Sequence, residues 1–163
     1  ILENWYQTNI GSKSDLAKNV ASGAYYCEQA KVKYDSSFTS GNAMMTTYTS
    51  YTPDFKCSTD GNGKGLVNAS VGLLTYDEVA YAGGYPQQTN STYYLYNPTV
   101  RSWLMSPSGV GSSFAEGWSI YNSGFQGFNT IDVKNSLLPL INLKSNTQIS
   151  DGNGTKENPF VVE

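Results

Sequence analysis

Apolar side chains recur at helical spacing at the start of the chain, at Leu2, Trp5, Tyr6 and Ile10. Residues three and four apart share one face of a helix, so the pattern predicts a short amphipathic helix. Its apolar face, Trp5 included, is expected to be buried. Gly11 follows at a position where the helix is expected to stop.

Two short elements are predicted after this helix. Ser14 and Asp15 suit the start of a second helix, which should end before Gly23. The run 24–27 has the sequence Ala-Tyr-Tyr-Cys and is predicted to be extended.

Thr75 and Glu78 form the clearest local signal in the chain. They have the spacing of a capping box. In this motif Thr75 accepts a hydrogen bond from a free amide of the first helical turn, and the Glu78 side chain reaches back to the Thr75 amide. The predicted helix continues through Ala82 and stops at Gly83–Gly84.

The pattern becomes β after residue 92. Strand-length runs separated by Pro, Gly, Asn and Ser occupy 93–96, 101–106, 114–121, 125–133 and 137–144. Pro139 lies within the last of these and favours an edge position or a bulge. The terminal run 160–162 follows a Gly/Asn turn and is predicted to pair back as a hairpin.

Helices first and antiparallel strands afterwards indicate an α+β fold. With 163 residues, the chain has the length of a single domain spanning 1–163. Only 14% of the residues are charged, and Ser, Thr, Asn, Gln and Gly supply most of the polarity. This composition is typical of a protein surface exposed outside the cell.

Charge and hydropathy narrow the range of partners. The formal net charge is −3, and the basic residues are dispersed. A nucleic-acid partner is not expected, because binding to phosphates requires clustered cations. No apolar run approaches the roughly 20 residues that span a bilayer. We therefore expect an extracellular or cell-surface ectodomain that contacts a membrane only through a missing anchor, its export signal removed.

The two cysteines, Cys27 and Cys57, are expected to form a disulfide in an oxidising compartment. Such a bond would stabilise the fold by about 3 kcal/mol in the chain-entropy model. It would hold in place a long ordered loop predicted over 36–52, ahead of a Gly/Asn turn at 60–65. Two reduced, buried thiols in a cytosolic protein are the alternative.

Catalysis and metal binding have little support in the sequence. The chain has no His, which excludes the Ser-His-Asp and Cys-His arrangements, and we expect no enzymatic activity. No cofactor is expected. The loops at 60–62 and 151–153 offer oxygen ligands for calcium, but they lack the carboxylate spacing of an EF-hand and are interpreted first as turns.

Five segments resemble the C-type-lectin-like fold, and more closely a group of bacterial surface domains found in exported or pilin-like proteins. They are Leu73–Gly84, Trp103–Pro107, Pro139–Lys144, Gly152–Thr155 and Pro159–Val162. The resemblance covers most of residues 66–163. It implies short N-terminal helices and a twisted antiparallel sheet with long loops, and it concerns architecture more than activity.

The resemblance has two departures from its family. Leu138 stands where Arg is expected before Pro139, so any ion pair made by that Arg is absent. The Glu-Pro-Asn, Gln-Pro-Asp and Trp-Asn-Asp motifs that hold calcium and sugar in the sugar-binding branch do not occur. Calcium-dependent sugar binding of that type is therefore not implied.

The tract 118–129 combines aromatic residues with Ser, Gly and Asn, as antibody loops do. The lectin-like resemblance implies that this segment lies near an exposed ligand face. The candidate ligand-binding residues are Tyr121, Asn122, Phe125, Gln126, Phe128 and Asn129. The alternative is a β-hairpin that turns at 122–124 and buries alternate aromatics. Trp103 and Trp118 are expected in the core.

Two functions follow as hypotheses. The first is a non-catalytic adhesion module that presents this aromatic, Ser/Asn-rich surface to a protein or glycan ligand. The second is the structural head of a pilin-like filament subunit, in which Ile1–Ile10 continues an anchoring helix and contacts filament neighbours.

Overall fold

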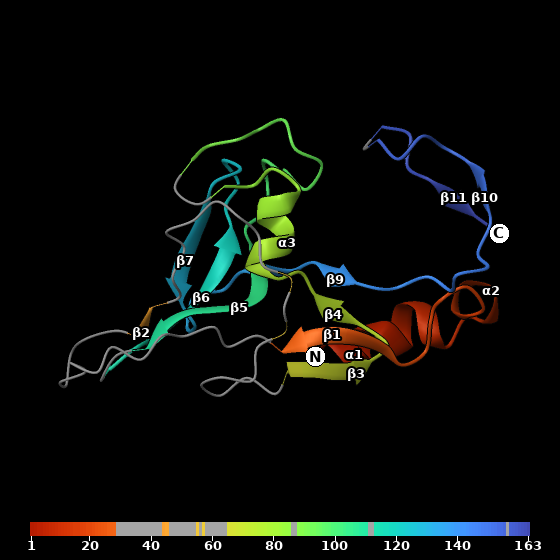
Figure 1. Ribbon diagram of the computed structural model, residues 1–163, viewed down its shortest axis with the longest axis horizontal. Helices are drawn as coiled ribbons and strands as arrows, with labels where there is room; N and C mark the ends of the chain where they lie inside the picture. The colour runs from red at the N-terminus through yellow and green to blue at the C-terminus, as the bar shows by residue number, and fades with distance from the viewer. Residues whose placement is uncertain are drawn as a thin grey trace. The chain divides into compact units, whose positions relative to one another are not determined.

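The computed structural model describes residues 1–28, 44–45, 55, 57, 65–85, 88–110, 113–155 and 157–163 (Figure 1). The chain divides into two compact units. The first comprises Ile1–Tyr26, Asn68–Gly72 and Pro139–Glu163, and the second comprises Cys27–Val67 and Leu73–Leu138. The described elements are short helices and mostly antiparallel strands, which confirms the α+β prediction.

The first unit begins with the predicted amphipathic helix. Helix α1 (Leu2–Tyr6) continues as a π-helical turn, η1 (Gln7–Gly11), and a second helix, α2 (Ser14–Ala17), follows. Tyr6 is buried with Val20 and Val71, and Leu2 and Ile10 pack against them.

The prediction that Trp5 is buried was wrong, because its side chain is 38% exposed. Leu2, Tyr6 and Ile10 follow one another at four-residue spacing and fill the side of the helix that faces the core. Trp5 precedes Tyr6 by one residue, so it is turned away from that side of the helix.

Short strand pairs complete this part of the chain. Strand β1 (Ala24–Glu28) pairs with β3 (Gly65–Ala69), which confirms the extended run at 24–27, and β4 (Gly72–Leu73) pairs with β9 (Pro139–Leu140). Strand β10 (Ile149–Asp151) pairs antiparallel with β11 (Val161–Val162). The predicted terminal hairpin is therefore confirmed.

The second unit is built on one sheet, visible in Figure 1 as the group of strands around β5, β6 and β7. Its strand order is β2-β5-β6-β7, with β8 pairing in parallel to β5. The bounds are β2 Met44–Met45, β5 Ser102–Val110, β6 Ala115–Ile120, β7 Gln126–Thr130 and β8 Ser136–Leu137. The runs predicted at 101–106, 114–121 and 125–133 are confirmed as β5, β6 and β7.

Helix α3 (Tyr76–Tyr81) begins with the predicted capping box. The Thr75 hydroxyl accepts a hydrogen bond from the Glu78 amide at 3.2 Å, and the Thr75 amide donates to Glu78 Oε2 at 2.7 Å. The helix ends before Gly83, whose φ of 102° favours glycine. The Tyr76 amide donates to Ser106 Oγ at 2.8 Å, which joins the helix to β5.

A cluster of Val79, Tyr93, Leu104, Trp118 and Ile120 forms the core of the second unit. Trp118 is 1% exposed, so its predicted place in the core is confirmed, whereas the side chain of Trp103 is only partly buried. Aromatic and aliphatic side chains from α3, β5 and β6 meet here and cover one face of the sheet. The opposite face is therefore the one considered below for ligand binding.

Two strand predictions were wrong. Residues 93–96 form a turn, closed by a hydrogen bond from the Tyr96 amide to the Tyr93 carbonyl at 3.0 Å. The side chains of Asn90 and Asn97 each accept from an amide two residues later, at Thr92 and Thr99 respectively. Turns of this kind on both sides bend the backbone, so Tyr93 packs in the core while Tyr94 stays exposed, and no strand forms.

The run 137–144 is divided between several partners instead of forming one strand. Its residues contribute to β8, which pairs with β5, to β9, which pairs with β4, and to a single bridge between Leu143 and Val20. Pro139 has no amide hydrogen to donate, which favours a change of partner at that position.

Cys27 and Cys57 lie within disulfide distance, with their Cα atoms 5.0 Å apart. The predicted pairing is therefore present. The predicted loop at 36–52 lies outside the described residues except at β2, and so does the predicted turn at 60–65 except at Gly65, which begins β3.

Candidate functional site

The tract 118–129 forms the antiparallel hairpin of β6 and β7. Trp118 pairs with Phe128, Ser119 with Gly127 and Ile120 with Gln126. The connecting turn is closed by hydrogen bonds from the Tyr121 amide to the Phe125 carbonyl and from the Gly124 amide to the Tyr121 carbonyl, both at 2.9 Å. The segment is therefore a β-hairpin that turns at 122–124, as the alternative drawn from the sequence describes.

The strand register sorts the hairpin side chains onto two faces. Trp118 and Ile120 point to the core, together with Gln126, which pairs with Ile120. Because side chains alternate along a strand, Ser119 lies on the opposite face, called here the outer face. Trp103 of β5 pairs with Ser119 and lies on that face as well.

Arg101, Tyr121 and Phe125 meet on the outer face and are called here the outer cluster. The Arg101 guanidinium carbon lies 4.2 Å from the centre of the Tyr121 ring. The Tyr121 and Phe125 ring centres are 5.5 Å apart, with the ring planes inclined by 43°. Arg101 is exposed, while both rings are partly buried, so the cluster borders solvent.

Gly127 makes room for the two rings of the outer cluster. A Cβ atom at this position would lie 2.7 Å from Phe125 Cε1 and 3.1 Å from Tyr121 Cζ. The absence of a side chain leaves room for both rings next to the backbone of β7. Any larger residue would push the rings away from the sheet.

The Tyr121 hydroxyl fixes its ring against the strand. It lies 2.9 Å from the Phe128 carbonyl and 3.1 Å from Asn129 Oδ1, both of which can accept its proton. Asn129 Nδ2 in turn donates to Ser119 Oγ at 2.8 Å. The orientation of Tyr121 is therefore set by the sheet itself, before any ligand arrives.

The six predicted ligand-binding residues do not form one surface. Tyr121, Phe125 and Asn129 share the outer face, and Asn122 is exposed in the turn. Phe128 projects to the other face, 37% exposed, with its ring edge-on to Trp118 at 5.9 Å. Gln126 is fully buried and donates through Nε2 to the Gly84 carbonyl, so it is not available to a ligand.

Sequence reasoning missed Arg101 and Trp103 as members of the outer face. The pairing register of β5 and β6 places both residues on this face. Once β5 is paired antiparallel with β6, Ser102 stands opposite Ile120. Arg101 then falls opposite Tyr121. Single-strand patterns do not contain this information, because they do not state which strands are neighbours.

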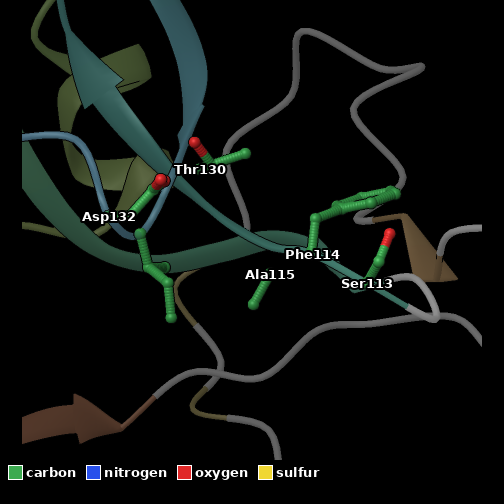
Figure 2. Close-up of a pocket in the computed structure, with 6 residues that line it drawn as sticks. Ser113, Phe114, Ala115, Thr130 and Asp132 are labelled. Carbon is green, nitrogen blue, oxygen red and sulfur yellow. The ribbon is translucent and has the colours of Figure 1, made fainter.

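A second candidate site is a cavity of about 430 Å³ at the other end of the same hairpin (Figure 2). It is lined by Ser113, Phe114, Ala115, Thr130, Ile131 and Asp132. Ser113, Phe114 and Ala115 lie at the start of β6, and Thr130, Ile131 and Asp132 lie at the end of β7. The cavity combines one carboxylate and two hydroxyl groups with an aromatic ring and aliphatic carbon.

Two buried polar groups lie on the core side, both against Gly84. Gln126 Oε1 and the Tyr93 hydroxyl have no hydrogen-bond partner among the described residues, and a Cβ atom on Gly84 would lie 3.1 Å from Tyr93 Cζ. Burial raises the pKa of Tyr93 from 10.0 to about 12, because the phenolate would lose its hydration.

In the part of the chain that the structure describes, no group of three or more Cys, Asp or Glu residues is placed to hold a metal ion. No helix in that part is long and apolar enough to cross a membrane. In the turn at 151–153, Asp151 and Asn153 accept hydrogen bonds from the nearby amides of Gly152 and Thr155.

Comparison with known proteins provides no match. No protein-family model, no curated protein and no solved structure is significantly similar to the chain.

Proposed function

We propose that the protein is an extracellular binding module of C-type-lectin-like architecture that captures a protein or glycan ligand on its outer face. The α+β fold with a mainly antiparallel sheet is compatible with that architecture. The Cys27–Cys57 pair suits an oxidising compartment. The role proposed is adhesion without catalysis.

The stacking of Arg101 on Tyr121 beside Phe125 is the observation that carries this proposal. Two partly exposed rings and an exposed guanidinium group are held together by contacts within one sheet. Association costs side-chain entropy, and side chains that are already ordered have less to lose. Rigid aromatics flanked by polar Asn side chains are the composition of a binding surface.

The outer cluster favours a ligand that carries an anionic group beside an apolar face. No carboxylate forms an ion pair with Arg101 among the described residues, so its guanidinium donors are available. Arginine presents several N–H donors in one plane and binds carboxylate or sulfate groups in a bidentate manner. The rings of Tyr121 and Phe125 supply the apolar contact.

A glycan array that includes neutral and acidic sugars, combined with capture of acidic peptides, would test the proposal. We expect wild-type protein to bind an acidic member and the Phe125→Ala variant to lose at least tenfold in affinity. Tyr94→Ala is the matched control, because Tyr94 is an exposed tyrosine outside the outer face. Equal losses in Phe125→Ala and Tyr94→Ala, or no binding by wild type to any probe, would contradict the proposal.

One observation favours the filament-subunit function as a second candidate. The hairpin of β10 and β11 exposes apolar side chains at Ile149, Phe160, Val161 and Val162. Contiguous exposed apolar residues are typical of surfaces that a partner covers. Sedimentation of wild type and of Ile149→Ser would test this: self-association lost in the variant supports subunit contacts, and a wild-type monomer at high concentration opposes them.

A further inference from the structure

We propose that the cavity between the start of β6 and the end of β7 is a binding site for a primary alkylammonium group, such as the side chain of a lysine. It lies at the opposite end of the hairpin from the outer cluster, and it does not rest on the function proposed for that cluster. The hairpin ladder from Glu116–Thr130 to Ile120–Gln126 separates the two sites.

The polar groups that line the cavity are free to accept hydrogen bonds. The Asp132 carboxylate and the hydroxyls of Ser113 and Thr130 make no side-chain hydrogen bond or ion pair within the described part of the chain. Figure 2 shows Thr130 and Asp132 on one side of this space and Ser113 with Phe114 on the other. The carboxylate and one hydroxyl therefore lie on one side of the cavity, and the second hydroxyl lies on the other side.

This lining selects the chemistry of the ligand. Among the described residues that line the cavity there is no Lys, Arg, Asn or Gln, so this part of the lining offers a negative charge and hydroxyls but no strong donor. An ammonium group has three donors and no acceptor, so it suits the Asp132 carboxylate and the Thr130 hydroxyl on the same side of the cavity. A carboxylate ligand would be repelled by Asp132, and a sugar would bring acceptor oxygens that only two hydroxyls could meet.

The apolar part of the lining suits the methylene chain that carries such a group. Ile131 is 68% exposed, and Phe114 is partly buried beside Ala115. Lysine-like chains cover apolar surface with their methylenes while the charged head stays at a polar edge. A cation near the Phe114 ring would gain further attraction from the ring face.

Backbone hydrogen bonds hold the two sides of the cavity together. The Ile131 amide donates to the Ala115 carbonyl at 3.0 Å, which joins the end of β7 to the start of β6. The Val133 amide donates to the Thr130 carbonyl at 3.1 Å and closes the turn that carries Asp132. The carboxylate is thus presented by an ordered turn. The net charge of −3 also favours a cationic ligand.

The proposal is tested by titrating the isotope-labelled protein, followed by amide NMR shifts, with n-butylammonium chloride. We expect saturable shifts confined to residues 113–115 and 130–133. Matched n-butanol and potassium butyrate should cause none. Nα-acetyl-lysine N-methylamide separates two sources of the same chemistry: tighter binding than n-butylammonium indicates a lysine of a partner protein, and equal binding indicates a free small amine.

Asp132→Asn removes the charge with little change in shape, and because Asp132 is exposed the variant should fold. We expect it to bind n-butylammonium at least tenfold more weakly, while Asp15→Asn, a change at another exposed carboxylate, leaves binding unchanged. Unaltered amide positions outside 113–133 verify the fold. Equal binding by wild type and Asp132→Asn, shifts spread over the whole molecule, or equal shifts with n-butanol would overturn the proposal.

Discussion

Gly124 lies directly against the backbone carbonyl of Asn90, leaving no space for a side chain at the tip of the β6–β7 hairpin. Asn90 is itself fixed, because its Nδ2 donates to the Gly83 carbonyl at 2.7 Å and its Oδ1 accepts from the Thr92 amide at 2.9 Å. Asn90 therefore links the end of α3, at Gly83, to the β6–β7 turn at Gly124.

Gly124→Ala should destabilise the protein. The residue has a φ of 76°, and a Cβ atom would also collide with Asn90. The backbone conformation alone costs about 1 to 3 kcal/mol for a residue other than glycine, and the collision adds to that loss. Chemical denaturation would measure the free energy of unfolding. Ser123→Ala, in the same turn but exposed, is the control and should change it little.

Arg101→Lys should weaken binding by the outer face without lowering stability. Lysine keeps the positive charge but loses the planar group that lies 4.2 Å from the Tyr121 ring centre and its paired donors. We expect about a tenfold loss in affinity for an acidic probe and an unchanged melting temperature. An affinity equal to that of wild type would show that charge alone is recognised and that the stacked geometry is irrelevant.

Tyr93 should make the protein lose stability at alkaline pH. Its pKa in the folded state is raised by burial from 10.0 to about 12, so the unfolded chain ionises first. The contribution is complete below pH 10 and is lost as the pH rises toward 12.

Denaturation of wild type and Tyr93→Phe between pH 8 and about 11.5 would isolate this contribution. The variant should lose less stability over that interval. At neutral pH it should be nearly as stable as wild type, since the hydroxyl that it removes has no hydrogen-bond partner in the described part of the chain. Parallel pH profiles for the two proteins would argue against a buried, neutral Tyr93.

Reduction of the Cys27–Cys57 bond should lower stability by about 3 kcal/mol in the chain-entropy model, since the bond links residues 30 positions apart. Melting curves with and without a thiol-free reductant would show the shift. The Cys27→Ser/Cys57→Ser double variant should match the reduced protein and should not respond to the reductant. A reductant effect of equal size on that variant would assign the loss to something other than the bond.

Elements that depend on a few neighbouring residues could be predicted from the sequence. The capping box at Thr75, the hairpin turn at 122–124 and the stop at Gly83 arise from contacts within a few positions, so composition and spacing are sufficient. The α+β class follows from the order of these elements. The burial of Trp118 was also expected, because a large ring gains most by leaving water.

Only the tertiary structure decided which face each side chain occupies. Gln126 and Phe125 are neighbours in one polar and aromatic tract, yet the first is buried beneath Gly84 and the second lies over Gly127 on the outer face. Successive side chains along a strand lie on opposite faces of the sheet, but this alternation does not decide which face meets the core. That depends on which elements pack against the sheet. Arg101 joined the site through its register with Tyr121, a relationship between residues 20 positions apart that no local pattern contains.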